Sequence, residues 1–366
     1  MLFLYLKILV INLMHIGDLL LVTPVLKTLR TNYPKAHIAL LADAKLRDLV
    51  KDNQHIDELI EIDKKGYHNN LLNYFKFIGA IRKKKFDIAI NLHANERASF
   101  IAAFSGAKKV VGYTTVGAGL FFDKVMKNTK AIKHQIHSHF DVLKEAVGVS
   151  EIDDGGLEMW LTKDAIASAN KLWQANYDKD TFVVGFNIGA SWETKRWCDE
   201  YYAIVADKLL DQGYGVAFFG GSMDEALVEK TINQMKHKSH DKLKIFTGKL
   251  SLQELGAMLK RCSVFLTNDS GPMHIAVALD VPVVTMFGAS PVPGFYPYND
   301  KSVLIKTPVK CHPCGIHHCD TLECMKTIGV DVVLEQVLTM LDKYKMSTGA
   351  VPRNIGQYQC EIIELH

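Results

Sequence analysis

Short apolar runs alternate with amphipathic segments along nearly the whole chain, and this alternation limits the possible folds more than any other feature. In the first half the apolar runs are KILVINL (7–13), HIALLAD (37–43), ELIEID (58–63), FDIAINL (86–92) and KVVGY (109–113). Apolar residues recur at helical spacing in segments 24–33, 70–82 and 96–105. Buried strands that alternate with helices are typical of βα units around a parallel sheet. The pattern therefore predicts a doubly wound α/β domain.

The alternation weakens over residues 148–173, where acidic and glycine residues cluster, and then restarts. The second series of predicted strands is FVVGFNIG (182–189), YGVAFFGG (214–221), LKIFTG (243–248), SVFLTN (263–268) and VPVVTMFG (281–288). The predicted helices of this half lie near 199–212, 223–237, 251–260 and 273–279. A chain of 366 residues also exceeds the usual size of a single core. We predict two Rossmann-like domains, 1–165 and 178–345, that face a central cleft, and a peripheral tail, 346–366.

Composition argues against two broad classes of protein. The 43 basic and 40 acidic residues leave a net charge of +3, which is too small for a general nucleic-acid-binding protein. No apolar run approaches the roughly 20 residues that span a bilayer, and the opening MLFLYL leads through Lys7 into a predicted strand. We therefore expect no nucleic-acid partner, no membrane span and no signal peptide.

Ligands of parallel sheets bind beyond the carboxyl ends of the strands, so the motifs that follow predicted strands are the candidates for a site. The first is HIGD (15–18), after the first strand. Asp18 is either a helix N-cap that accepts backbone N–H groups or a general base that faces the cleft. In the second interpretation Gly17 allows a substrate to approach closely. This motif by itself does not separate the two.

The second motif, GASWETKRW (189–197), follows the first strand of the second half. Its small and hydroxyl residues, with Lys195 and Arg196, could supply backbone N–H groups, a hydroxyl and a cation to a phosphate. The alternative is a solvated surface loop with ordinary charges. The segment lacks the pattern of a Walker loop.

The third motif, TNDSGPMHIA (267–276), lies where a predicted strand ends and a helix begins. Asp269 or Ser270 as N-cap, with Pro272 in the first turn, fits the chemistry of a helix start, and its free amides form an anion site. Capping alone leaves His274, one turn later, unexplained. A weaker element, GGSMDE (220–225), suits ribose hydroxyls, although acids in a first turn also simply complement the helix dipole.

Together these segments resemble the lipopolysaccharide heptosyltransferases of glycosyltransferase family 9. The resemblance is carried by KILVINLMHIGDLLLVTPVLKTLR, IGASWETKRW, LTNDSGPMHIAVALDVPVVTMFGAS and the CHPC segment, in order, over roughly residues 6 to 340. It implies the GT-B architecture, with an acceptor-binding first domain and a nucleotide-sugar-binding second domain. It also implies a metal-independent, inverting transfer of heptose from ADP-heptose to the inner core of lipopolysaccharide, at the cytoplasmic face of a bacterial inner membrane.

The resemblance also implies roles for residues at matching positions. Asp18 matches the base that activates the acceptor, Lys195 the cation on the donor phosphates and Ser191 a hydroxyl near them. Asp269 matches the acid that holds the sugar hydroxyls. The remaining donor contacts that it implies are Ser270, Gly271, Asp224, Leu250 over the adenine, and His274. The resemblance further implies that no cofactor is required. The chain departs from the family after Trp197, where members of the family often carry proline and this chain has Cys198.

The predicted acceptor is anionic, and the first domain offers basic residues to meet it. The weakly predicted acceptor contacts are Gly17, Arg97 and His137. The run RKKK (82–85) and the segment KHQIHSH (133–139) are further candidates for the acceptor or for the inner membrane surface. For the RKKK run the solvated end of a helix is the simpler interpretation.

Four of the seven cysteines cluster in CHPCGIHHCDTLEC. Cys311, Cys314, Cys319 and Cys324, with three histidines nearby, have a spacing that could hold a structural zinc ion. Local disulfides and plain thiols are the alternatives, and zinc is not the favoured one. The segment resembles one found in one branch of the heptosyltransferases, so it supports membership rather than a separate function.

Three rival functions are open to a chain of this kind. One is a related glycosyltransferase that uses another nucleotide sugar or a protein acceptor. Another is a non-catalytic nucleotide-binding α/β protein. A third, a nicotinamide oxidoreductase, is disfavoured because no G-x-G-x-x-G follows either first strand.

Overall fold

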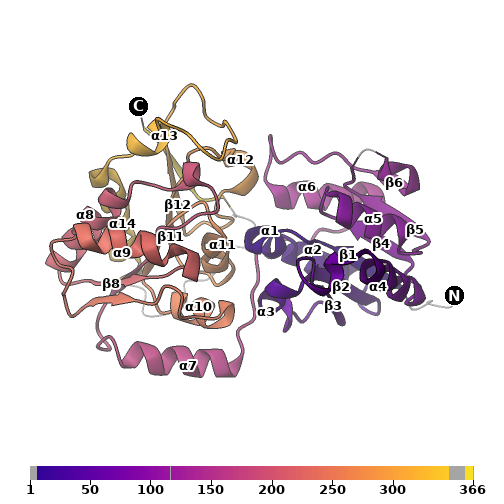
Figure 1. Ribbon diagram of the computed structural model, residues 1–366, viewed down its shortest axis with the longest axis horizontal. Helices are drawn as coiled ribbons and strands as arrows, with labels where there is room; N and C mark the ends of the chain where they lie inside the picture. The colour runs from indigo at the N-terminus through magenta and orange to yellow at the C-terminus, as the bar shows by residue number, and fades with distance from the viewer. Residues whose placement is uncertain (1–5, 116, 346–358, 366) are drawn as a thin grey trace. The chain divides into compact units, whose positions relative to one another are not determined.

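The chain forms two compact units, residues 1–160 and 161–366, each built on its own parallel sheet (Figure 1). The structure is a computed structural model that describes residues 6–115, 117–345 and 359–365. Within these ranges no helix has both the length and the apolar character needed to cross a membrane.

The sheet of unit 1 has six parallel strands in the order β3-β2-β1-β4-β5-β6. The chain adds strands outward from β1 to β3 on one side and from β4 to β6 on the other, so the order of the strands reverses between β1 and β4. Ligands of doubly wound sheets bind at such a switch point. The strands are β1 (Lys7–Ile11), β2 (His37–Asp43), β3 (Glu58–Ile62), β4 (Ile88–Asn91), β5 (Lys109–Gly112) and β6 (Lys124–Val125).

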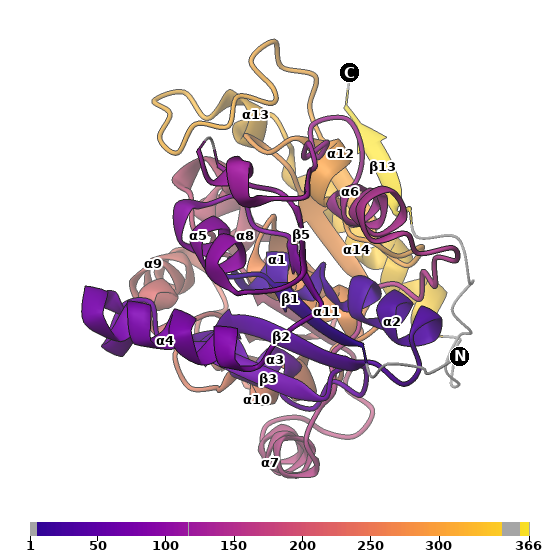
Figure 2. The same ribbon diagram turned by 90° about the vertical axis from the view of Figure 1, so that its right-hand side faces the viewer.

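Helices cover both faces of this sheet, with α2 and α6 on one side and α4 and α5 on the other (Figure 2). Side chains of β1, β2 and β4 pack against α4 and α5 in one apolar core, which explains why these strands read as unbroken apolar runs. The helices are α1 (Ile16–Leu20), α2 (Thr23–Asn32), η1 (Ala44–Leu46), α3 (Arg47–Val50), η2 (Tyr67–Asn69), α4 (Leu71–Lys83), α5 (Glu96–Phe104), η3 (Ala118–Phe121), α6 (Gln135–Asp141) and η4 (Val142–Val147).

The sheet of unit 2 has seven parallel strands in the order β13-β12-β11-β10-β7-β8-β9. Here β7 and β10 are neighbours, as β1 and β4 are in unit 1. The strands are β7 (Val183–Asn187), β8 (Gly215–Phe218), β9 (Leu243–Ile245), β10 (Val264–Asn268), β11 (Val283–Met286), β12 (Val303–Lys306) and β13 (Glu361–Glu364).

A large apolar core joins the sheet of unit 2 to α8, α9 and α14, while α10 packs against both α7 and α11. Ser251 caps α10 and Glu254 returns the bond to the backbone of Ser251, so the sequence of that turn specifies its start. The helices are α7 (Lys163–Gln174), η5 (Glu193–Lys195), α8 (Asp199–Asp211), η6 (Ser222–Asp224), α9 (Glu225–Gln234), α10 (Leu252–Leu259), α11 (Gly271–Ala278), α12 (Val292–Phe295), α13 (Glu323–Lys326) and α14 (Val330–Lys345).

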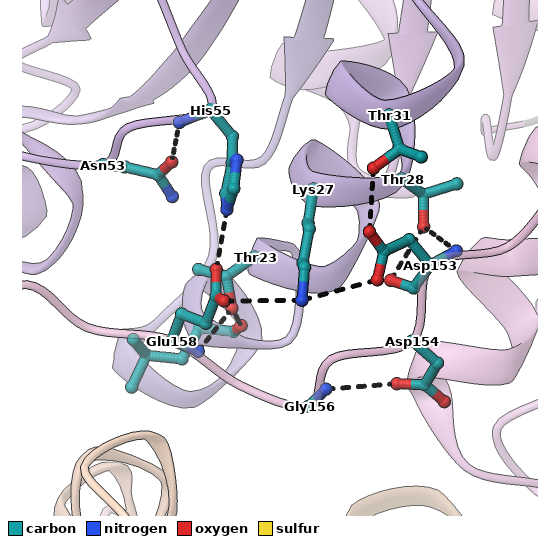
Figure 3. Close-up of polar contacts among 11 residues, drawn as sticks. Thr23, Lys27, Thr28, Thr31, Asn53, His55, Asp153, Asp154, Gly156 and Glu158 are labelled. Carbon is teal, nitrogen blue, oxygen red and sulfur yellow. Dashed lines mark hydrogen bonds and ion pairs between the residues drawn. The ribbon is translucent and has the colours of Figure 1, made fainter. Parts of the chain in front are cut away.

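The end of unit 1, residues 151–160, is tied to helix α2 by side chains spaced along that helix (Figure 3). The Thr23 hydroxyl accepts from the Glu158 amide at 3.0 Å, and the Thr31 hydroxyl donates to the Asp153 carboxylate at 2.8 Å. Lys27 lies between these two carboxylates, 3.4 Å from Asp153 and 3.9 Å from Glu158. These contacts explain why the first unit extends to Trp160 although the alternating pattern has already faded.

The two parallel sheets confirm the predicted α/β class with two Rossmann-like domains. The additional strands β6, β12 and β13 were not among the expected ones. Of the predicted tail, residues 346–358 and 366 lie outside the described residues, and residues 361–364 form the edge strand β13 beside β12.

Candidate active site

Buried asparagines mark the carboxyl ends of the central strands and hold the loops that follow them. Asn12, just after β1, accepts from the Met14 amide at 3.0 Å, and Asn91, at the end of β4, donates to the Tyr113 carbonyl at 2.7 Å. Asn187 and Asn268 stand at the ends of β7 and β10. An amide side chain both donates and accepts, so it can satisfy the backbone groups that a strand end leaves unpaired.

Asp18 occupies the third position of the short helix α1, directly beyond β1. The N-cap position of α1 belongs to His15, so the interpretation of Asp18 as the N-cap residue is wrong. The side chain of Asp18 is 20% exposed, and its Oδ2 lies 3.9 Å from Nδ1 of His15, whose side chain is 83% exposed. The carboxylate is therefore partly accessible, at the switch point of the sheet.

Asp18 contributes to the wall of a cavity of about 130 Å³ that lies within unit 1. Polar side chains predominate in this wall, as expected for a site that receives hydroxyl groups. The lining residues are Asn12, Met14, Asp18, Leu92, His93, Ala94, Asn128, Lys130, Gln135 and His139.

Two histidines of this cavity are neutral at physiological pH. Burial lowers the pKa of His93 to about 4, and the charges of Lys64 and His15 act in the same direction. Burial lowers the pKa of His139 to about 3. The buried Nδ1 of His93 has no hydrogen-bond partner among the described residues. A neutral imidazole beside a carboxylate can orient a hydroxyl by a hydrogen bond without competing for its proton.

The other predicted acceptor contacts are placed differently from Asp18. Gly17 is buried in α1. Arg97 donates to the Lys64 carbonyl at 2.6 Å and to Asn69 at 3.3 Å, so it holds the loop after β3 and does not line the cavity. His137 is exposed on α6 and is also not part of the lining. Gln135 and His139, on either side of His137, face the cavity instead.

In unit 2 the structure brings together two residues that the sequence placed in separate motifs. Nζ of Lys195 lies 2.8 Å from Oδ2 of Asp269, and the two side chains are 19% and 6% exposed. The hydroxyl of Ser290 donates to the same carboxylate oxygen at 2.5 Å. We call Lys195, Asp269 and Ser290 the lysine–aspartate cluster. Its cation and carboxylate are held in a fixed geometry, as a site for a polar, anionic ligand requires.

The asparagines of unit 2 connect the two loops that carry this cluster. Asn268 accepts from the Trp197 amide at 2.9 Å and donates to the Ile188 carbonyl at 2.8 Å. Asn187 donates to the hydroxyl of Ser270 at 3.1 Å. The loop from 188 to 197 is thus fixed against the end of β10.

Helix α11 begins at this edge of the sheet, with Ser270 as N-cap and Pro at its second position. The side chain of Ser270 makes no capping bond, so the amides of the first turn stay available to an anion. His274, buried one turn later, has its pKa lowered to about 4 by burial, although the charge of Asp269 raises it. The Nδ1 of His274 lacks a partner within the described ranges.

The glycine-rich turn after β8 also faces the loop of Lys195. A Cβ atom at Gly189 would stand 2.1 Å from Oδ1 of Asp224, so only glycine fits beside this carboxylate. Asp224 accepts from the Gly221 amide at 2.9 Å, and burial raises its pKa against the opposing effects of that bond and of Arg196. Ser191 is exposed and Leu250 is half-buried, just before α10.

The cysteine-rich segment packs on the loop of Lys195. The ring of His317 stacks on Trp192 at 4.0 Å, and Nζ of Lys195 lies 4.5 Å from the centre of the same Trp192 ring. His318 forms a 2.6 Å bond with Glu193. The segment therefore supports the loop that carries Lys195.

All seven cysteines are free thiols, so none of the local disulfides considered from the sequence is formed. Cys311 and Cys314 are exposed and Cys324 is buried. Among the described residues no group of three or more His, Cys, Asp or Glu side chains is arranged to hold a metal ion.

Several residues of these two sites were not predicted from the sequence. They are Asn12, Asn91, His93, Asn187 and Ser290. Gln135, His139, Trp192 and Asn268 lie inside segments that the sequence singled out, but no individual role was predicted for them. The asparagines carried a usable signal, because each ends or directly follows an apolar run, where a polar side chain is unexpected. Ser290 carried none, because its partner Asp269 lies 21 positions earlier in the sequence.

Comparison with known proteins decides the family. The model of glycosyltransferase family 9 (heptosyltransferase) matches residues 74–325. The chain belongs to glycosyltransferase family 9. It is therefore a glycosyltransferase, and the resemblance noted in its motifs is confirmed.

Heptosyltransferases and a family 9 structure align over most of the chain. A lipooligosaccharide heptosyltransferase 2 of Haemophilus influenzae is 25% identical, over 82% of this chain and 88% of that protein. A family 9 structure from Veillonella parvula is 33% identical with a TM-score of 0.86, over 94% and 99% of the two chains. The Escherichia coli ADP-heptose lipopolysaccharide heptosyltransferase II is 22% identical with a TM-score of 0.76, over 93% and 100%. The likeness to the E. coli enzyme shows that this chain and that protein share the two-domain fold.

Proposed function

We propose that the protein moves heptose from ADP-heptose to the inner core of lipopolysaccharide with inversion at the anomeric carbon. Membership of family 9 supports heptose transfer, and the names of the relatives from H. influenzae and E. coli supply the substrate class. Because such an acceptor is lipid-anchored, the reaction takes place at the cytoplasmic face of a bacterial inner membrane.

The observation that carries the proposal is the accessible carboxylate of Asp18 in a polar cavity at the switch point of unit 1. Inverting displacement needs one base that takes the proton of the acceptor hydroxyl as the new bond to the anomeric carbon forms. Asp18 acts as this base, and neutral His93 and Gln135 orient the acceptor. Arg97, His137 and Gly17 stay weaker candidates for acceptor contacts.

The donor binds to unit 2, where the lysine–aspartate cluster and the start of α11 lie at one edge of the sheet. Lys195 and the amides of Ser270 and Gly271 neutralise the charge that develops on the departing ADP, without a metal ion. Asp269 holds hydroxyls of the sugar beside His274. The adenosine lies toward Asp224 and Leu250, with Ser191 near the phosphates.

The test combines a donor comparison with two matched variants. The purified protein is incubated with a truncated lipopolysaccharide acceptor and with ADP-heptose, UDP-sugars or GDP-sugars, and nucleotide release is measured with and without EDTA. We expect turnover with ADP-heptose in both cases. Turnover only with another donor, or none with any, would overturn the proposed substrate, and loss of activity in EDTA would overturn metal independence.

The base is tested by Asp18→Asn, with Asp52→Asn, an exposed carboxylate outside the site, as the control. We expect Asp18→Asn to lower kcat by about 10²–10⁴-fold, as for the loss of a general base, with an unchanged melting temperature. Asp52→Asn should leave both unchanged. If Asp18→Asn mainly lowers the melting temperature and kcat persists, the carboxylate has a structural role.

A further inference from the structure

Unit 1 exposes large apolar side chains on one side of its sheet, over α4 and η3. At the start of α4, Leu71, Leu72 and Phe75 are 72%, 66% and 56% exposed. On η3, Leu120 and Phe121 are 90% and 53% exposed. Single apolar residues on a surface are common, but a gathering of this size is not.

These side chains belong to one continuous surface, because aromatic rings connect α4 to η3 across α5. The ring of Phe75 lies 6.1 Å from that of Phe100, which lies 4.4 Å from Phe104. Phe104 in turn lies 5.2 Å from Phe121. Figure 2 shows α4 and α5 next to each other on this side of the sheet. We call the surface formed by Leu71, Leu72, Phe75, Leu120 and Phe121 the α4–η3 patch.

The segment that carries most of the patch is strongly basic. Residues 64–85 contain seven lysines and arginines and no aspartate or glutamate. Two of these cations are used within unit 1: Lys64 pairs with Asp43 at 3.0 Å and Lys84 pairs with Glu58 at 2.5 Å. Five others form no ion pair among the described residues, namely Lys65, Lys76, Arg82, Lys83 and Lys85.

Two of these cations share the outer face of α4 with an apolar residue of the patch. Leu72, Lys76 and Lys83 are exposed and are spaced by four and seven positions, which places them along one side of a helix. A helix that offers apolar side chains and unpaired cations to the same side is suited to an anionic lipid surface. The apolar groups enter the boundary of the acyl chains, and the cations meet the headgroups.

We propose that the α4–η3 patch docks unit 1 on an anionic membrane surface. On the proposed function, on which this rests, such docking brings the enzyme to its lipid-anchored acceptor. The hydroxyl of Tyr74, on α4, donates to the Arg97 carbonyl at 3.0 Å, at the start of α5. The loop before α5 carries His93, which lines the cavity of Asp18. The helix that carries most of the patch is thus bonded to α5 close to the loop that lines the cavity.

The experiment measures binding of the full chain to vesicles that contain no acceptor. Vesicles of phosphatidylcholine alone are compared with vesicles of equal parts phosphatidylcholine and phosphatidylglycerol, by co-sedimentation at low and high salt. The charge variant is Lys76→Gln with Arg82→Gln and Lys83→Gln, and the apolar variant is Leu72→Ser with Leu120→Ser. Their controls lie on unit 2: Lys171→Gln with Lys179→Gln and Lys238→Gln, and Ile166→Ser with Ile204→Ser.

We expect the unaltered chain to bind the anionic vesicles and to be released by salt, because salt screens exposed charges. Loss of three cations should weaken binding roughly a hundredfold, at about fivefold per cation, since each basic residue near an anionic surface contributes about 1 kcal/mol. The apolar variant should weaken binding at least about tenfold. The controls should bind as the unaltered chain does, and all variants should keep its melting temperature.

Failure of the unaltered chain to bind anionic vesicles, or equal losses in the variants and their controls, would overturn the proposal. The proposal would also fail if the apolar variant still bound vesicles but no longer self-associated in sedimentation. The patch would then be an interface between copies of this chain. A lipid-free core oligosaccharide separates this inference from the proposed function. All variants should turn it over normally, whereas vesicle binding without any turnover would refute the function and leave the docking surface intact.

Discussion

At the scale of single residues, the donor half of the site depends on an ion pair in which the carboxylate is buried and the ammonium is half-buried. Lys195→Met leaves Asp269 without its cation, so we expect the free energy of unfolding to fall by about 2 kcal/mol, less than for a fully buried pair because Lys195 keeps 19% exposure. The double variant Lys195→Met with Asp269→Asn should regain most of this stability. Neither variant should use the donor normally.

Urea denaturation and donor kinetics check this prediction, with Lys230→Met as the control. Lys230 pairs with Asp199 on the surface, where its own side chain is 64% exposed, so the change should be below about 1 kcal/mol. Equal stability of the single and double variants would show that Asp269 does not need the cation. A normal donor KM in Lys195→Met would remove this residue from the site.

The neutral histidines make stability depend on pH in a definite direction. Burial lowers the pKa of His139 to about 3 in the folded state, against a normal value of 6.5. Between these values the unfolded chain binds a proton that the folded chain does not, so stability falls as the pH falls through this window, by up to about 1.4 kcal/mol per pH unit. His139→Gln should reduce this slope. His137→Gln, at an exposed neighbour, should leave it unchanged, and equal slopes in all three proteins would contradict the assignment.

At the scale of elements, the cysteine-rich segment acts on the donor loop through its histidines. His317 stacks on Trp192, the ring that also lies under the Lys195 ammonium. His317→Ala should raise the donor KM about fivefold, since such a ring contact contributes about 1 kcal/mol, and should leave the acceptor KM unchanged. His237→Ala, on the surface of unit 2, is the control. A lower melting temperature with an unchanged donor KM would show that the segment only packs.

Most strands and helices could be predicted because each of them is visible in a short stretch of sequence. A run such as HIALLAD becomes a strand wherever it is buried on both faces, and its pattern does not depend on its neighbours. The edge strand β13 was not expected, because its place is decided by pairing with β12, distant in the sequence. Strand pairing between distant segments leaves little trace in local composition.

At the scale of the whole molecule, the segment 151–160 decides where the first unit ends. Leu157 and Met159 are buried, and residues 151–158 bond to Thr23, Thr28, Thr31 and Asn32 of α2. We expect the fragment 1–160 to fold independently. A fragment that ends at residue 150 should be less stable by about 4 kcal/mol, from lost hydrogen bonds and apolar burial. Denaturant unfolding of the two fragments checks this, and equal stabilities would show that the segment adds nothing.

The α/β class, the order of most elements and the motifs at strand ends could be read from short stretches of sequence, because apolar periodicity and helix-start chemistry are local properties. It also marked Asp18, Lys195 and Asp269 as candidates. The folded chain was needed to show that Lys195 and Asp269 share one ion pair, that His93 and His139 face the cavity of Asp18, and that Arg97 holds a loop. These outcomes depend on which strands become neighbours and on the burial that follows, and the chain sets both through contacts between residues far apart in sequence.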